Sequence, residues 1–191
     1  MLMVHGRGAT AASILTLSAE FDHEGLAFLA PQAAGGVWYP NSFLAPIASN
    51  EPWLSSALSV LADVCRDIEA HGPGVRRTVL LGFSQGTCLS VEFAARNPAR
   101  YGAIIGFSGG LIGPEGTPRE YPGSFDGTPV FLGSSDPDPH VPTQRVRETA
   151  EVLSAMGAVV TTRIYPRLGH TVNRDEMDAA NNLVTAMLTD S

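Results

Sequence analysis

The chain is poor in the residues that stabilise secreted or metal-containing proteins. It has only two cysteines, Cys65 and Cys88, among 191 residues. Both fall in segments predicted to be helical, so we expect two free thiols rather than a disulfide framework. No group of His, Asp and Glu shows the spacing of metal ligands, and we expect neither a metal nor another cofactor. Free thiols are typical of a reducing compartment, which favours a cytoplasmic protein.

Charge and long apolar runs are also scarce. Only 16% of the residues are charged, and the net charge is −7. The basic residues form no cluster longer than Arg76-Arg77, so nucleic acid is not an expected partner. No apolar stretch reaches the roughly eighteen residues of a membrane span, so we expect no membrane insertion. The apolar run within residues 1–6 is too short for a signal peptide.

Short apolar segments alternate with longer amphipathic ones. Hydrophobic residues make up 44% of the sequence, enough for the core of a single domain covering residues 1–191. The pattern predicts strands at 2–5, 27–30, 78–82, 103–107, 130–133 and 159–165, and helices at 10–22, 51–71, 84–96, 142–156 and 174–189. Such alternation predicts an α/β fold, with a mostly parallel sheet of about six strands flanked by helices.

Residues typical of helix ends stand at two of the predicted boundaries. We expect Asn50 to cap the helix at 51–71, with Pro52 in its first turn and Gly72 at its end. Asn173 and Glu176 have the spacing of a capping box at the start of the last helix.

Residues 82–86 read Gly-Phe-Ser-Gln-Gly, which matches the pattern G-x-S-x-G. The pattern alone is weak, because the chain contains 20 glycines. Its setting is more specific, since a predicted strand precedes it and a predicted helix follows it, as a nucleophile elbow requires. The flanking glycines let backbone pass close to Ser84, and the helix directs its first N–H groups at developing negative charge. We therefore predict that Ser84 is a nucleophile.

A serine hydroxyl becomes a good nucleophile when a base takes its proton. In this type of fold the acid and then the histidine follow the serine along the chain. Of the five histidines, only His170 lies in a loop after the last predicted strand, so it is the expected base. The acid should follow the strand at 130–133, where both Asp136 and Asp138 stand. Their positions alone do not decide which of the two is the acid.

Acyl transfer also needs donors for a negatively charged oxygen, usually two backbone N–H groups. We expect one from Gln85, directly after the nucleophile, and the other from Arg7, in the loop after the first predicted strand. The side chain of Arg7 is also a candidate for contact with an acidic or polar group of a substrate.

Together these motifs resemble the phospholipase/carboxylesterase branch of the α/β-hydrolases, which includes the acyl-protein thioesterases. The likeness covers nearly the whole chain and rests on segments that contain His5-Gly6-Arg7-Gly8, Trp38-Tyr39, the Ser84 motif, residues 107–110, residues 138–142 and Gly169-His170. Family members have a segment Asp-x-Asp-Pro-x-Val-Pro in which the second Asp is catalytic. The resemblance therefore implies Asp138 as the acid, and it implies the same pair of oxyanion donors.

The chain departs from the family in two respects. The family usually starts with an antiparallel pair of strands before the His-Gly loop, and here that loop starts at residue 5, so we expect a sheet without the pair. Arg7 stands where an apolar residue is common in the acyl-protein thioesterases, which argues against a long-acyl substrate. In addition, no insertion is long enough to form a cap domain.

The sequence thus predicts a serine carboxylesterase that acts on small-molecule esters with short to medium acyl chains, as a monomer or a homodimer. Trp38 and Tyr39 in segment 31–50, and Leu111 in segment 108–128, are candidate walls of the acyl pocket. An aromatic anchor packed on the core is an equal alternative for the first two. Two other functions stay open: a lysophospholipase or acyl-protein thioesterase, and a non-catalytic ligand-binding protein of the same fold. An intact set of Ser, Asp and His argues against the latter.

Overall fold

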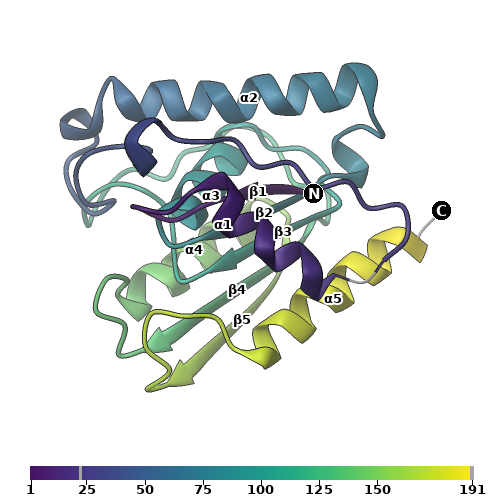
Figure 1. The fold of residues 1–191 in the computed structure, drawn as a ribbon. Helices are drawn as coiled ribbons and strands as arrows, with labels where there is room; N and C mark the ends of the chain where they lie inside the picture. The colour runs from purple at the N-terminus through teal and green to yellow at the C-terminus, as the bar shows by residue number, and fades with distance from the viewer. Residues whose placement is uncertain (22, 190–191) are drawn as a thin grey trace.

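The computed structural model describes residues 1–21 and 23–189, and a single β-sheet lies at its centre (Figure 1). Within this part of the chain the sheet has five strands, β1 (Leu2–Val4), β2 (Val79–Phe83), β3 (Ala103–Phe107), β4 (Pro129–Asp136) and β5 (Val159–Pro166). Their order across the sheet follows the sequence, and every neighbouring pair is parallel. The predicted parallel sheet is confirmed.

Helices cover both faces of this sheet (Figure 1). On one face lie α2 (Trp53–His71), α3 (Gln85–Arg96) and α4 (Thr143–Ala155), which share one apolar core with the strands. On the other face lie α1 (Ala11–Leu15) and α5 (Arg174–Thr189), which share a second core. Because both faces are covered, the central strands are almost wholly buried and apolar.

The prediction of a strand at 27–30, and with it a sixth strand, is wrong. Only Leu29 pairs there, in an isolated parallel bridge with Leu2, and its carbonyl accepts a hydrogen bond of 2.7 Å from Met3 N. Pairing does not continue because Pro31 has no N–H to donate. The segment nevertheless runs beside β1 at this point, so the β1 edge of the sheet is partly covered.

The first predicted helix is shorter than expected. α1 ends at Leu15 and is followed by the 3-10 turn Thr16–Glu20, while the predicted end at residue 22 lies outside the described residues. Three further 3-10 turns, in the segments before and after α2, are Ala34–Gly36, Ile47–Asn50 and Val75–Arg77.

The predicted N-cap of α2 is also wrong. The helix begins at Trp53 with Pro52 in the capping position, and it ends at Gly72 as expected. Asn50 is instead a buried residue of the preceding loop, where its side chain accepts a hydrogen bond of 2.8 Å from Asn41 N. Its amide nitrogen donates to the Ser42 carbonyl at 3.1 Å. Because its side chain is used by these loop contacts, Asn50 organises the loop and not the helix.

α5 begins with the predicted capping box. Asn173 N donates to the Glu176 carboxylate and Glu176 N donates to the Asn173 side chain, both at 2.9 Å. Glu176 is fully buried against β4, where a Cβ on Gly133 would collide with its other carboxylate oxygen. Burial raises the pKa of Glu176 to about 7, although the hydrogen bond from Asn173 acts in the opposite direction.

We expect Glu176→Gln to change how the stability depends on pH. A carboxyl whose pKa rises from 4.5 to about 7 on folding binds its proton more tightly in the native state. Its contribution to stability is therefore complete below the lower value and is lost as the pH rises through the higher one. Glutamine cannot ionise, so the melting temperature of the variant should rise relative to that of the unmodified protein between about pH 5 and pH 8.

Thermal melts of both proteins across this range measure the difference. Asp178→Asn, which removes an exposed carboxylate from the same helix, controls for the loss of one charge. A melting-temperature difference that stays constant across this pH range would show that the Glu176 carboxyl is already ionised in the native protein at the lower end of the range.

Candidate active site

The predicted catalytic side chains all follow the carboxyl ends of strands. Ser84 follows β2, Asp138 follows β4 and His170 follows β5, while the loop that contains Arg7 follows β1. Because the strands are parallel neighbours, these ends meet at one edge of the sheet, where folds of this class bind ligands.

Ser84 occupies a sharp turn between β2 and α3. Its backbone has φ of 55° and ψ of −120°, a combination that residues with a side chain rarely adopt. The turn is fixed at both ends, since Ser84 N donates to the Phe107 carbonyl at 2.9 Å and the Ser84 carbonyl accepts from Cys88 N at 3.0 Å. This conformation presents the hydroxyl at the edge of the sheet instead of within it.

Two glycines make the turn possible. A Cβ on Gly82 would lie 2.5 Å from the carbonyl carbon of Gly86. A Cβ on Gly86 would collide with the Val4 carbonyl at the end of β1 and lie 2.7 Å from the His5 carbonyl. Neither position has space for a side chain, so the two glycines of the motif reflect two close backbone approaches.

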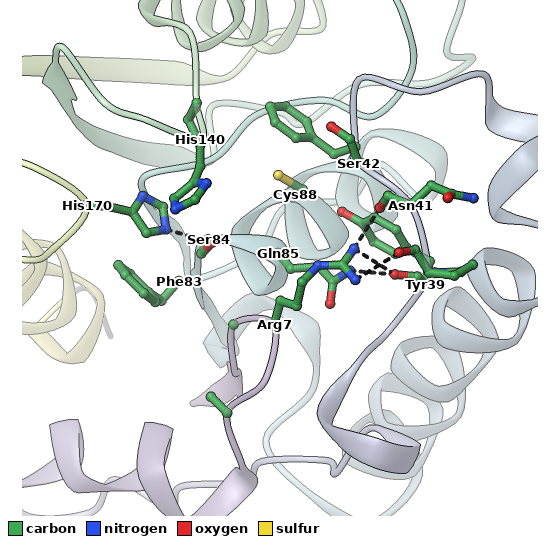
Figure 2. A pocket seen from close by; sticks show the side chains of 15 residues that line it. Arg7, Tyr39, Asn41, Ser42, Phe83, Ser84, Gln85, Cys88, His140 and His170 are labelled. Carbon is green, nitrogen blue, oxygen red and sulfur yellow. Dashed lines mark hydrogen bonds between the residues drawn. The ribbon is translucent and has the colours of Figure 1, made fainter.

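A continuous chain of hydrogen bonds joins the three predicted catalytic residues. Ser84 Oγ lies 2.8 Å from His170 Nε2, and His170 Nδ1 lies 2.8 Å from Asp138 Oδ2 (Figure 2 shows the first contact). With the carboxylate as acceptor, the Nδ1 atom carries the proton and leaves Nε2 free to accept from the hydroxyl. The geometry is that of a nucleophile, a base and a group that orients the base.

Asp138 is held firmly in place. Its side chain is fully buried, and its second carboxylate oxygen accepts from the backbone N–H groups of His140 at 2.8 Å and Val141 at 3.0 Å. Burial acts to raise the pKa of this carboxyl, but the hydrogen bonds from His170 and the two N–H groups outweigh burial and lower it. The acid therefore stays ionised and can stabilise a protonated imidazole.

Asp136 occupies a different environment. It is the last residue of β4, is exposed, and uses its backbone carbonyl to accept from Arg167 N at 2.9 Å. The structure thus brings Asp138 and not Asp136 to His170.

His170 is packed between two rings. Its centroid lies 5.1 Å from that of Phe83 and 4.8 Å from that of His140, which meets it edge to face. The loop before it is tied to β4, because Gly169 N donates to Ser135 Oγ at 2.9 Å. These contacts fix the imidazole next to the nucleophile.

Arg7 and Gln85, whose backbone N–H groups are the predicted oxyanion donors, both line the cavity beside Ser84. Within residues 1–21 and 23–189, neither of them donates a backbone hydrogen bond. Gln85 is the first residue of α3, so its N–H has no partner within the helix. Two free donors beside Ser84 are what an oxyanion hole requires.

The side chains of the same two residues hold segment 38–41. Gln85 accepts from Trp38 N at 3.0 Å and donates to the Tyr39 carbonyl at 2.8 Å. The Arg7 guanidinium donates to the carbonyls of Tyr39, Pro40 and Asn41 at 2.7 to 2.9 Å (Figure 2). The two residues predicted to supply the oxyanion donors therefore also fix one wall of the site.

A cavity of about 500 Å³ opens beside Ser84 (Figure 2). Its apolar lining is provided by six residues, Ala9, Pro40, Phe43, Phe83, Val141 and the ring of Tyr39. Its polar lining consists of Arg7, Asn41, Ser42, Ser84, Gln85, Cys88, His140 and His170, and Gly6 completes the wall. No aspartate or glutamate of the described segments lines it.

Only part of the predicted pocket wall lies there. Tyr39 lines the cavity, although its side chain is almost completely buried. Trp38 is a core residue whose indole nitrogen donates to the His5 carbonyl at 2.9 Å. Leu111 is fully buried below the loop, and its carbonyl accepts from Arg145 at 2.7 Å. The structure therefore does not place Trp38 or Leu111 on the cavity wall.

Several lining residues escaped the sequence prediction. Cys88 stands four residues after Ser84, in the first turn of α3, a spacing that keeps it close to the residue before the helix. His140 and Val141 follow Asp138 in a segment that must approach His170, so they necessarily lie near the base. These two spacings are the signals that could have found them.

Both cysteines are buried and free. Burial raises the pKa of Cys88 to about 12 and that of Cys65 to about 11. Each stays a thiol near neutral pH, so Ser84 is the candidate nucleophile of the cavity.

In the described ranges no group of three or more His, Cys, Asp or Glu is placed to hold a metal ion. Among the same residues, no helix combines the length and apolar character that a bilayer crossing needs.

We expect Gln85→Glu to destabilise the protein by about 1–3 kcal/mol, because the new carboxylate would face the Tyr39 carbonyl in place of a donor. Denaturant unfolding of the variant and of Gln144→Glu, the same change at an exposed position on α4, measures this effect. Equal stability of the two variants would contradict the role of Gln85 in holding the wall.

Known proteins share both the sequence pattern and the fold. Acyl-protein thioesterase 1 of Gibberella zeae is 32% identical over 111 residues, which are 53% of this chain and 44% of that protein. The chain thus aligns with about half the length of this curated relative.

The structural likeness is more extensive. The crystal structure of a phospholipase/carboxylesterase from Dyadobacter fermentans has a TM-score of 0.93 and 44% identity, over 96% of this chain and 88% of that one. Esterase PE8 has a TM-score of 0.83 and 27% identity, over 97% and 91% of the two chains. The sequence model of the phospholipase/carboxylesterase family matches residues 1–188. The chain belongs to the phospholipase/carboxylesterase family and has the α/β-hydrolase fold.

Proposed function

We propose that the protein is a serine carboxylesterase that hydrolyses short- to medium-chain carboxylic esters through an acyl-enzyme on Ser84. The observation that carries this proposal is the unbroken hydrogen-bond chain from Ser84 through His170 to Asp138, located at a cavity. Membership of a hydrolase family supports the same conclusion.

In the first half of the reaction, Ser84 Oγ attacks the ester carbonyl carbon while its proton passes to His170 Nε2. The carbonyl oxygen becomes negative and accepts from the N–H groups of Arg7 and Gln85. The bond between this carbon and the alcohol oxygen then breaks, and His170 gives its proton to the departing alkoxide. An acyl group remains on Ser84.

In the second half, water takes the place of the alcohol. His170 removes a proton from the water, whose oxygen attacks the acyl carbon, and the same two N–H groups stabilise the second intermediate. The bond to Ser84 breaks, Ser84 Oγ regains a proton from His170, and the carboxylic acid leaves. Asp138 stabilises the imidazolium that forms in both halves.

The size and lining of the cavity support a small substrate. About 500 Å³ accommodates a short ester, and no element of the described chain forms a cap above it. The lining includes Cys88 and Tyr39, and the thiol and the phenol are close enough to interact with each other. A long alkyl chain placed there would cover polar groups without offering them a hydrogen bond.

An acyl-protein thioesterase is the second candidate, because the Gibberella zeae relative carries that name. A lysophospholipase would place the same demand on the site, since both would act on longer acyl chains. Acyl-chain length therefore separates these functions from the proposed one.

Rates on p-nitrophenyl esters of increasing acyl length test the proposal. We expect kcat/KM to be highest for short to medium chains and to fall for long chains, because polar side chains make up much of the cavity lining. Ser84→Ala should remove essentially all of this activity, since only the nucleophile forms the acyl-enzyme. A faster reaction with long-chain thioesters or lysophospholipids would favour the second candidate. No turnover, together with no labelling of Ser84 by a fluorophosphonate, would favour a binding protein.

Asp138→Asn should lower kcat by about four orders of magnitude, because an amide cannot stabilise the imidazolium or select the same tautomer. Asp136→Asn makes the same chemical change two residues away, at an exposed side chain, and should cost far less. Steady-state kinetics of both variants on one short ester measure the difference. Similar losses in the two variants would contradict the assignment of Asp138.

A further inference from the structure

The cavity beside Ser84 has a positive lining in an otherwise acidic protein. The chain has a net charge of −7, yet within its described residues no aspartate or glutamate lines the cavity, whereas Arg7 does. The nearest carboxylate of the site, Asp138, is fully buried and occupied by His170. A bound molecule therefore meets the charge of Arg7 with no opposing carboxylate on the cavity wall.

The charge of Arg7 is held in place without being neutralised. All three of its side-chain hydrogen bonds go to backbone carbonyls, those of Tyr39, Pro40 and Asn41. Within residues 1–21 and 23–189 it forms no ion pair, in contrast to Arg96, which is paired with the buried Glu92 at 2.7 Å. Since a guanidinium has five N–H donors, three of which are used here, Arg7 can still donate to a ligand.

This fixed geometry favours binding of an anion. Neutral carbonyls position the guanidinium before any ligand arrives, so little side-chain entropy is lost when one binds. Figure 2 shows Arg7 and Asn41 on one side of the cavity and His140 and His170 on the other, with Ser84 between them. A substrate whose ester carbonyl lies at Ser84 can therefore extend a second group toward Arg7.

We propose that the natural substrate is an ester that carries a carboxylate, and that the side chain of Arg7 binds this carboxylate. The proposal rests on the esterase function proposed above and specifies its substrate class. The Arg7 side chain acts on specificity, while its backbone N–H serves the oxyanion. The carboxylate belongs either to the acyl part or to the alcohol part of the ester, and the experiment distinguishes the two.

Two matched pairs of esters test the proposal. Monomethyl glutarate and methyl valerate differ by a carboxylate on the acyl part, and 3-acetoxypropionate and propyl acetate differ by one on the alcohol part. We expect kcat/KM to be at least about tenfold higher for the charged member of one pair, the effect of a hydrogen bond to a charged group. The preference should fall at high salt, because part of the interaction is exposed to solvent.

Variants of Arg7 identify the group responsible. Arg7→Met should reduce the charged-to-neutral ratio of kcat/KM to near one, and Arg7→Lys should restore most of the ratio because the charge is kept. Both variants also lose contacts to segment 39–41, so their absolute rates should fall. The ratio separates charge recognition from this structural loss, since a displaced wall affects both members of a pair. Arg76→Met, an exposed arginine before β2 at the opposite edge of the sheet, controls for net charge.

Binding of glutarate to Ser84→Ala, measured by calorimetry, separates the two proposals. Hydrolysis of neutral esters without preference for the charged members, or a ratio that survives in Arg7→Met, would overturn the substrate inference and leave the esterase function intact. Absence of hydrolysis, together with glutarate binding that requires Arg7, would overturn the esterase function and support the anion site. Absence of both hydrolysis and binding would overturn both.

Discussion

The close approach of α3 to the end of β1 is the constraint on which the rest of the site depends. Gly86 packs against the carbonyls of Val4 and His5 with no space for a Cβ, so the helix start is fixed against the strand end. This contact holds the start of α3, with Ser84 and Gln85, next to the loop after β1 that contains Arg7. A strained turn persists because the packing around it leaves no alternative conformation.

The same approach couples the chemistry to the shape of the cavity. Arg7 and Gln85 offer backbone N–H groups on one side, and their side chains bind segment 38–41 on the other. A shift of that segment would therefore be transmitted to the two residues proposed to supply the oxyanion donors. The neutral carbonyls that position Arg7 leave its charge available, so a single residue links the wall, the donors and the proposed recognition of a carboxylate.

The sequence predicted the parallel sheet well because buried strands and amphipathic helices differ in length and periodicity. It failed where one residue had two possible partners. Asn50 has a side chain that suits an N-cap, but in the folded loop this side chain accepts from the N–H of Asn41. Residues 27–30 are apolar enough for a strand, but Pro31 stops the pairing. The residues of the cavity wall were the hardest to predict. Trp38 and Leu111 are apolar side chains of the kind that line acyl pockets, but both are buried in the core.

The sequence by itself determined the order of the elements and the identity of the elbow, because G-x-S-x-G between a strand and a helix has a local steric cause. It also limited the acid to Asp136 or Asp138 and the base to His170, because both must follow late strands. Only the tertiary structure decided which carboxylate reaches the imidazole, and which side chains face the cavity. The physical reason is that these properties depend on contacts between segments that lie 32 to 86 residues apart in the chain, as in the pairs of His170 with Asp138 and Ser84.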